Sequence, residues 1–262
     1  MVVDARLSVH DVTFLGADAE QMIAYWEALG VRRLSLIDSE LSDPLLRKAV
    51  SANDYSVETV YHLFASADGL NRVVDSAAEV GARVVYMLTG GRAGLDWAQA
   101  AARFCDVVQP GVDRARDAGV ALAIENASSL YADIHIAHTL TDTVRLAEMA
   151  GVGVCIDLFH CWAEADLPAL LERALPRTEM IQLSDYVLGD RCLPARAVPG
   201  DGAIPLEPIL TQVLNSGYAG GFDLELIGPR IDAEGRLTAA RRACEVVSDL
   251  LGHIPESGDG TR

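Results

Sequence analysis

The sequence predicts an α/β protein that folds as one closed barrel of eight parallel strands, each followed by a helix, a (β/α)8 TIM barrel. Short runs of β-branched residues alternate with longer amphipathic stretches along almost all of the 262 residues, which is typical of a parallel sheet. The chain has 50% hydrophobic and 23% charged residues, the profile of a folded domain. Its length is also that of a single barrel, which commonly needs about 250 residues.

The expected strands are short and largely apolar. Residues 152–156, for example, contain almost only apolar side chains, as expected where helices cover both faces of a parallel sheet. The eight strands are expected at residues 7–14, 33–37, 56–62, 82–87, 121–125, 153–157, 179–183 and 222–226.

The segments between the strands have the periodicity of helices. In residues 19–29, the apolar side chains of Met22, Ile23 and Trp26 recur at helical spacing, and residues 70–80 follow the same pattern. A glycine follows several of these helices and allows the left-handed conformation that ends a helix. These glycines are Gly30, Gly81, Gly119 and Gly151.

One domain is expected over residues 1–262, with a flexible C-terminal tail at residues 252–262. The alternative architecture is an open, doubly wound sheet. Such sheets often carry a Gly-x-Gly-x-x-Gly motif after the first strand, where a dinucleotide binds. The sequence has no such motif there, so the closed barrel is favoured.

The charge of the chain disfavours nucleic acid as a partner. The 38 acidic residues outnumber the 21 basic ones and give a formal net charge of −17, whereas binding to a phosphate backbone requires clustered Lys and Arg. No stretch reaches the roughly 18 apolar residues that a membrane span needs. The N-terminus has no basic region followed by an apolar one. A cytoplasmic protein without a membrane partner is therefore expected.

The five cysteines predict neither disulfides nor a thiolate zinc site. They are odd in number and scattered, and no Cys-x-x-Cys motif occurs.

Polar side chains interrupt four consecutive apolar strands of the predicted barrel. Glu125 and Asp157 end two strands, and Gln182 and Glu225 lie inside the next two. Active sites of such barrels form at the carboxyl ends of the strands, and a buried charge is costly unless it is paired or binds a metal. Three carboxylates and one amide oxygen suit one Mn²⁺ or Mg²⁺ ion. The alternative is that Asp157 and Glu225 cap helices or pair with arginines.

The order of these motifs resembles a known superfamily. Glu125 follows the fifth strand, Asp157-x-x-His160 follows the sixth, and Arg196-x-x-Pro-Gly-x-Gly lies ahead of Glu225. The pattern is similar to that of the sugar phosphate isomerase/epimerase superfamily of xylose isomerase-like barrels. That group includes ketose 3-epimerases, hydroxypyruvate isomerase and inosose dehydratase.

The resemblance implies a divalent metal held by Glu125, Asp157, Gln182 and Glu225, with the two glutamates also placed for proton transfer. Most members of the superfamily carry His where this chain has Gln182. The epimerases tend to have a further Glu soon after the fifth strand, and residues 126–131 contain none.

The expected chemistry is proton transfer at carbon. A cation that binds adjacent carbonyl and hydroxyl oxygens acidifies the α-proton and stabilises an enediolate. Glu125 and Glu225 are the expected base and acid. His160 is expected to contact a substrate oxygen or to relay a proton, the alternative being a loop histidine bonded to the backbone.

Further residues are expected to bind substrate. His62, near the end of the third strand, and Arg196, in the long loop at residues 186–205, are both candidates, and this loop is expected to close over the substrate. A rim histidine and a solvated arginine are the alternatives. His135 and His138 have a spacing that could bind metal, but they are expected in a surface loop.

The leading hypothesis is a metal-dependent isomerase or epimerase of a sugar or a small polyhydroxy carbonyl compound. The alternative is a dehydratase or other carbon–oxygen lyase, because both reactions begin with the same proton abstraction. A non-catalytic sugar-binding barrel is disfavoured by the converging carboxylates, and an abasic-site endonuclease by the negative charge. A carbohydrate-like small molecule is thus the expected partner, and a homo-oligomer is compatible with the sequence.

Overall fold

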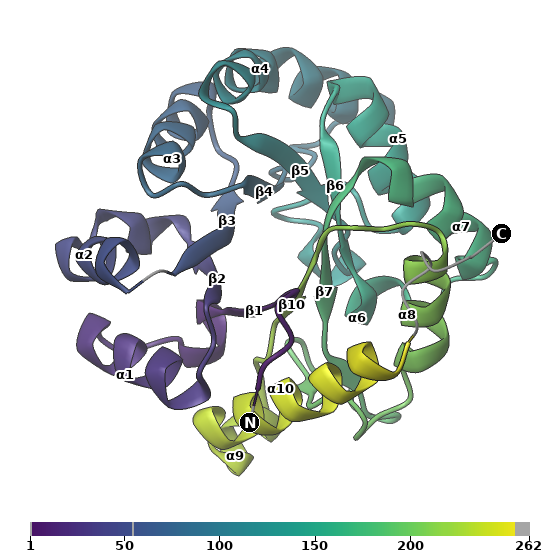
Figure 1. The fold of residues 1–262 in the computed structure, drawn as a ribbon. Helices are drawn as coiled ribbons and strands as arrows, with labels where there is room; N and C mark the ends of the chain where they lie inside the picture. The colour runs from purple at the N-terminus through teal and green to yellow at the C-terminus, as the bar shows by residue number, and fades with distance from the viewer. Residues whose placement is uncertain (1, 54, 255–262) are drawn as a thin grey trace, which may run out of the picture.

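Eight parallel strands form a closed barrel in a computed structural model that describes residues 2–53 and 55–254 (Figure 1). This confirms the predicted (β/α)8 architecture. Around the barrel the strands follow the order β1-β10-β7-β6-β5-β4-β3-β2. They span Leu7–His10 (β1), Arg33–Ile37 (β2), Ser56–Leu63 (β3), Val84–Leu88 (β4), Ala121–Glu125 (β5), Gly153–Asp157 (β6), Thr178–Leu183 (β7) and Gly221–Leu224 (β10).

The helices surround this barrel and cover its outer face (Figure 1). The α-helices are Ala19–Leu29 (α1), Pro44–Ala52 (α2), Ala67–Glu79 (α3), Trp97–Ala118 (α4), Leu140–Ala150 (α5), Leu158–Cys161 (α6), Leu167–Ala174 (α7), Leu206–Asn215 (α8), Pro229–Glu234 (α9) and Arg236–His253 (α10). Short 3-10 turns span Asp11–Phe14 (η1), Asp38–Ser42 (η2), Ser129–Tyr131 (η3) and Leu175–Arg177 (η4). In the described part of the chain, no helix is both long and apolar enough to cross a membrane.

Local sequence signals account for the helix ends. Gly30, Gly119 and Gly151 adopt the left-handed conformation as C-caps of α1, α4 and α5, as predicted. Gly81 is also left-handed, but it lies one residue beyond the C-cap Val80 of α3. All five cysteines are free, as predicted.

Some predicted boundaries are wrong. The first strand was expected at residues 7–14 but ends at His10, because the Asp11 carboxylate accepts a hydrogen bond from the Ile37 backbone N–H and the chain turns into η1. The eighth strand, β10, ends at Leu224 instead of residue 226. Helix α10 continues to His253, so residues 252 and 253 are not part of a tail. Residues 255–262 of that tail lie outside the described residues.

Strand alternation divides the buried side chains into two sets. Side chains such as Val9, Val85 and Ile156 belong to the apolar layer between the strands and the helices. The opposite set faces the barrel interior, where Tyr86, Cys155 and Met180 form a smaller apolar cluster with Val84 and Ala123. Every second residue of a strand therefore faces inward, and the last of these residues reach the carboxyl end of the barrel.

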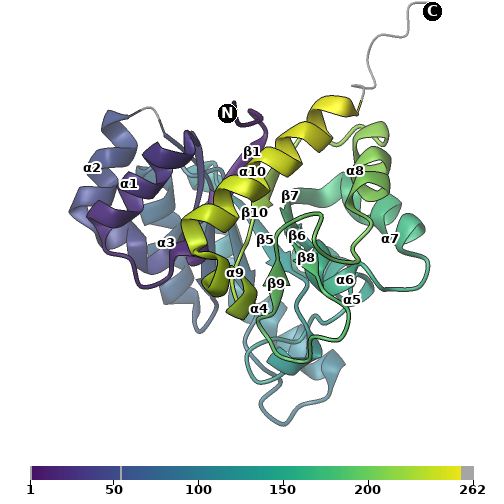
Figure 2. The same ribbon diagram turned by 90° about the horizontal axis from the view of Figure 1, so that it is seen from below.

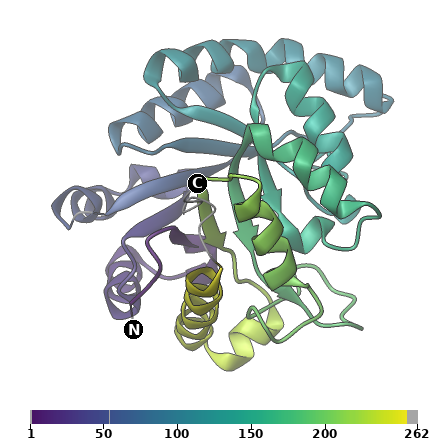
Figure 3. The same cartoon turned by 45° about the vertical axis from the view of Figure 1, so that its right-hand side comes forward.

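The C-terminal helix closes the barrel next to its first strand. Helix α10 packs on β1, β10 and α1. Figures 2 and 3 show the yellow α10 beside the purple N-terminal segment. The two ends of the described chain are thereby held together at the seam where the barrel closes.

One buried carboxylate organises the long loop after β7. A two-residue antiparallel ladder joins Asp185–Tyr186 (β8) to Arg196–Ala197 (β9). The Asp185 carboxylate is almost fully buried and accepts hydrogen bonds from the backbone N–H groups of Tyr186, Gly200, Gly202 and Ile204, at 2.8–3.0 Å. This anchor fixes the loop on both sides of Arg196.

We predict that Asp185→Ala destabilises the protein by roughly 2–4 kcal/mol, because several buried N–H groups lose their only carboxylate acceptor. Urea unfolding, followed by circular dichroism, measures the loss. The control is Asp75→Ala, which removes an exposed ion pair with Arg114 and should cost less than about 1 kcal/mol. Equal effects of the two substitutions would contradict the anchoring role of Asp185.

Candidate active site

A cavity of about 250 Å³ opens at the carboxyl ends of the strands, where barrels of this type build their active sites. Its polar lining includes Glu125, His160, Arg196 and Glu225, together with the hydroxyl-bearing side chains of Tyr61 and Tyr86. Two of the predicted acids, Glu125 and Glu225, therefore line the same space as the predicted arginine.

Glu125 is the last residue of β5 and faces the interior, two positions after the inward-facing Ala123. The next residue, Asn126, is fully buried and ties β5 to β6: its amide donates to the Asp157 carbonyl and its oxygen accepts from the Asp157 backbone N–H, both at 2.9 Å. These two bonds tie the residue after Glu125 to the backbone of Asp157 and so fix the ends of the two strands to each other. Asn126 is not among the site residues expected from the sequence.

His135 holds the main chain of Glu125 from the other side. Its Nε2 lies 2.9 Å from the Glu125 carbonyl, and its Nδ1 accepts from the Thr89 backbone N–H at 3.1 Å. Burial lowers the pKa of His135 to about 3, so the ring is neutral, as this pair of bonds requires. The prediction of a surface loop is wrong for His135, which is fully buried because it satisfies the backbone groups at two strand ends.

Asp157 pairs with Arg196. The guanidinium Nη2 donates to Asp157 Oδ2 at 2.6 Å, and Nη1 donates to Oδ1 at 3.2 Å. Burial alone would raise the pKa of Asp157, but the cationic Arg196 outweighs it and lowers the pKa. Asp157 is therefore ionised at neutral pH.

Glu225 is the first residue after β10 and shares the same arginine. Arg196 Nη2 donates to Glu225 Oε1 at 3.0 Å, and Gln182 Nε2 donates to Oε2 at 2.6 Å. Burial raises the pKa of Glu225, although Arg196 opposes the rise. The guanidinium also lies over the ring of Phe159, 4.8 Å from its centroid.

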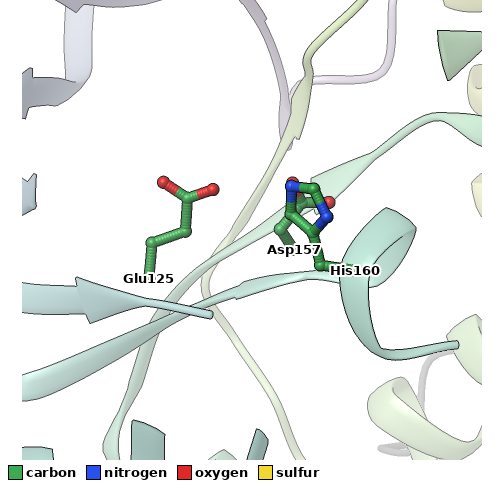
Figure 4. Close-up of side chains that lie close together, drawn as sticks. All are labelled: Glu125, Asp157 and His160. Carbon is green, nitrogen blue, oxygen red and sulfur yellow. The ribbon is translucent and has the colours of Figure 1, made fainter. Parts of the chain in front are cut away.

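Gln182 and His160 present different groups to the acids: Gln182 presents its amide NH₂ to Glu225, whereas His160 presents a ring nitrogen near Glu125 and Asp157. The Gln182 amide group donates to Glu225 and to the Tyr86 hydroxyl, while its oxygen accepts from the Cys155 thiol at 3.4 Å. Potential ligand atoms of Glu125, Asp157 and His160, by contrast, all lie within 4.8 Å of one another. Figure 4 shows these three side chains converging from β5, β6 and α6. In this rotamer Gln182 thus directs its NH₂, not its oxygen, toward the acids.

Tyr86 connects the acids to the first strand. His10 Nε2 lies 2.7 Å from the Tyr86 hydroxyl. Burial would lower the pKa of His10, but the hydrogen bond and charge of Asp11 outweigh it and raise the pKa to about 9. Because His10 Nδ1 accepts from the Val12 backbone N–H at 3.0 Å, the proton on Nε2 donates to the Tyr86 oxygen, and so does the Gln182 amide. The hydroxyl hydrogen of Tyr86, which lines the cavity, is therefore left for another acceptor.

The charges of the site do not balance among its own side chains. One guanidinium pairs with the carboxylates of Asp157 and Glu225, and a third carboxylate, that of Glu125, lies close to Asp157. Burial, with the charges of Glu225 and Asp157, raises the pKa of Glu125 well above its usual value. A divalent cation would supply the two missing positive charges, and carboxylate oxygens are ligands that Mn²⁺ and Mg²⁺ accept. The donor set therefore fits such an ion.

His62 does not line the cavity, so the prediction that it contacts substrate is not supported. Its Nδ1 lies 2.5 Å from Asp38 Oδ2 in η2. The neighbouring Tyr61 lines the cavity instead, with its ring 5.5 Å from that of Tyr86. A register shift in the pairing of β2 with β3 accounts for the difference, because one extra residue in a strand exchanges the inward and outward faces.

The chain is similar in sequence to a protein of Streptomyces coelicolor named "Putative hydroxypyruvate isomerase". The two are 32% identical over 85 residues, which form 31% of this chain and 28% of that protein. The match thus spans less than a third of the curated relative's length.

Solved structures share the fold over nearly the whole chain. A protein of Sinorhizobium meliloti 1021 has a TM-score of 0.81 at 22% identity and covers 96% of this chain and 99% of its own. The IOLI protein, solved with a zinc atom, has a TM-score of 0.79 at 16% identity, with 95% and 99% covered. D-allulose 3-epimerase from Methylomonas sp. has a TM-score of 0.77 at 12% identity, with 95% and 100% covered.

A family-wide comparison agrees with the fold and with the resemblance found in the sequence. The family described as "Xylose isomerase-like TIM barrel" matches residues 14–250. This range includes all strands from β2 to β10 and every acidic residue of the candidate site. The chain therefore belongs to the xylose isomerase-like TIM barrel family.

Proposed function

We propose that the protein is a divalent-metal-dependent isomerase or epimerase that acts on a small, sugar-like α-hydroxy carbonyl compound through an enediolate. The observation that carries the proposal is the group of three carboxylates at the mouth of the barrel, those of Glu125, Asp157 and Glu225, of which the last two pair with Arg196. Membership of the xylose isomerase-like family and the similarity to a named epimerase and a named isomerase support it.

Glu125, Asp157 and Glu225 are the proposed carboxylate ligands of one Mn²⁺ or Mg²⁺ ion. The fourth ligand in the sequence-based prediction is Gln182, which would have to turn its amide to present oxygen. His160 is the alternative that its distance from Glu125 and Asp157 supports. When bound, the ion would supply positive charge that stabilises the negative charge developing on the substrate oxygens.

The side chains of the site divide the remaining work. Glu125 and Glu225 exchange the proton of the α-carbon, one as base and the other as acid. Burial raises the pKa of both, which brings them closer to the range in which a carboxyl group can give a proton back at neutral pH. His160, Arg196 and the Tyr86 hydroxyl orient the substrate oxygens, and Leu193 and Pro194 of the β7–α8 loop cover the cavity against water.

We predict that the protein takes up one Mn²⁺ per chain in isothermal titration and that Glu125→Gln and Asp157→Asn each weaken the affinity at least about tenfold, because each loses an anionic ligand. The control is Glu58→Gln, which alters a buried carboxylate that pairs with Arg33 and Arg83 outside the site. Uptake that is absent in the unaltered protein, or equal in all four proteins, would refute the site. Loss of affinity in Gln182→Ala but not in His160→Ala would identify Gln182 as the fourth ligand, and the opposite result would identify His160.

We predict that a true substrate exchanges its α-proton with solvent in D₂O and that Glu225→Gln and Glu125→Gln slow this exchange by roughly 10²–10⁴-fold, because an amide cannot accept the proton. Proton NMR with the Mg²⁺-loaded protein follows the exchange, and product analysis separates isomerisation from β-elimination. Exchange at the unaltered rate in both variants would exclude the two glutamates as acid and base.

We predict that Arg196→Ala lowers turnover at least about 10²-fold and strengthens Mn²⁺ binding, because Asp157 and Glu225 lose the cation that now neutralises them. Arg196→Lys keeps the positive charge but cannot make two parallel hydrogen bonds to a carboxylate. Its turnover and its Mn²⁺ affinity should therefore lie between those of the unaltered protein and those of Arg196→Ala. Steady-state kinetics and Mn²⁺ titration measure the two effects. Unchanged turnover together with unchanged metal affinity would show that Arg196 has no part in the site.

A further inference from the structure

The three tyrosines that line the cavity differ in what their hydroxyl groups contact. They are Tyr61, Tyr86 and Tyr131. The Tyr86 oxygen is bonded to His10 and to Gln182. In the described part of the chain, by contrast, no group lies within hydrogen-bond distance of the Tyr61 or the Tyr131 hydroxyl, and neither oxygen is sealed off by burial. Two hydroxyl groups at the cavity are therefore open to a ligand.

The two tyrosines lie at different points around the mouth of the barrel. Tyr131 belongs to η3, in the loop after β5, and is thus on the side of the carboxylates. Tyr61 belongs to β3, which lies between β2 and β4 and is adjacent to none of β5, β6 and β10, the strands at whose ends the three carboxylates lie. A substrate chain that extends from the carboxylates across the mouth toward β3 therefore meets Tyr61.

Aromatic packing holds both rings in place. The Tyr61 ring lies 5.5 Å from the ring of Tyr86, and the Tyr131 ring meets that of His160 edge to face at 6.2 Å. Such contacts stabilise the orientation of each ring. Because the rings are already ordered, a ligand that bonds to their hydroxyls loses little binding energy in fixing them.

The charges around the two tyrosines favour an uncharged partner. Burial raises the pKa of Tyr61 and of Tyr131, so both are phenols at neutral pH and can donate a hydrogen bond. Arg196 is the only lysine or arginine among the described residues that line the cavity, and Asp157 and Glu225 already hold its guanidinium. An anionic group would find no free cation there, whereas a substrate hydroxyl can both accept from a phenol and donate to one.

We propose that Tyr61 and Tyr131 bind hydroxyl groups of the substrate beyond its two reacting carbons, so that the substrate is a polyhydroxy ketone or aldehyde. The proposal rests on the proposed function for the reacting end of the molecule. Two hydroxylated carbons beyond the reacting pair give a chain of at least about four carbons. The volume of about 250 Å³, at the lower limit of ordinary ligand cavities, restricts the substrate to a short chain.

The test compares two four-carbon ketones that differ only in the hydroxyls beyond the reacting pair. Erythrulose carries a hydroxyl on its third and on its fourth carbon, and 1-hydroxy-2-butanone carries none there. D-Ribulose and D-fructose extend the hydroxylated series. Proton NMR in D₂O follows exchange at the first carbon with the Mg²⁺-loaded protein, and isothermal titration gives each dissociation constant whether or not the compound reacts. We expect erythrulose to exceed 1-hydroxy-2-butanone by about 10–100-fold in kcat/KM or in affinity.

Variants that lack a single oxygen test each tyrosine. Tyr61→Phe and Tyr131→Phe keep the rings and their packing, and each should reduce the preference for erythrulose over 1-hydroxy-2-butanone by roughly 3–10-fold, because one neutral hydrogen bond is lost. The matched control is Tyr25→Phe, a half-buried tyrosine of α1 that packs on Phe14 and does not line the cavity. An unchanged preference in one variant excludes that tyrosine. An unchanged preference in both, or an equal change in the control, overturns the proposal.

The two readouts separate this proposal from the proposed function. Exchange with 1-hydroxy-2-butanone at least as fast as with erythrulose, in the unaltered protein and in both variants, overturns the hydroxyl contacts and leaves the isomerase function standing. Tighter binding of erythrulose that the variants weaken, without any proton exchange, supports the hydroxyl contacts and contradicts the isomerase function. Failure of erythrulose, D-ribulose and D-fructose to bind at about 10 mM, a very weak affinity, overturns the proposal.

Discussion

The site depends on one guanidinium held between the buried carboxylate of Asp157 and the half-buried carboxylate of Glu225. Arg196 lies in the loop between β7 and α8, 39 residues after Asp157 in the chain. From this loop it reaches both Asp157 and Glu225. Without a cation beside it, either carboxylate would be costly to bury at this depth. The Asp185 anchor, the β8–β9 ladder and the Asn126 bridge all serve the same geometric requirement, because each fixes one partner of this ion group.

Much of the fold could be predicted because its signals are local. Apolar periodicity identifies α1 and α3, and the glycines after α1, α4 and α5 mark the turns into the next strands. The end of β1 could not be read in this way. Val12 and Phe14 continue an apolar alternation that suits a strand, and the turn after His10 is caused by a bond from Asp11 to a residue of β2, 26 positions away.

The candidate site was predictable where a carboxylate comes at the end of an apolar strand or directly after it, as Glu125, Asp157 and Glu225 do. Tyr86 and His135 were not predictable, since a tyrosine inside a strand and a histidine in a loop have ordinary structural roles, and only the bonds to Gln182 and to the Glu125 carbonyl distinguish them. That Tyr61 lines the cavity and His62 does not has a different cause. The face on which a side chain lies after a register shift is decided by pairing with the neighbouring strand, which the sequence of β3 alone does not contain.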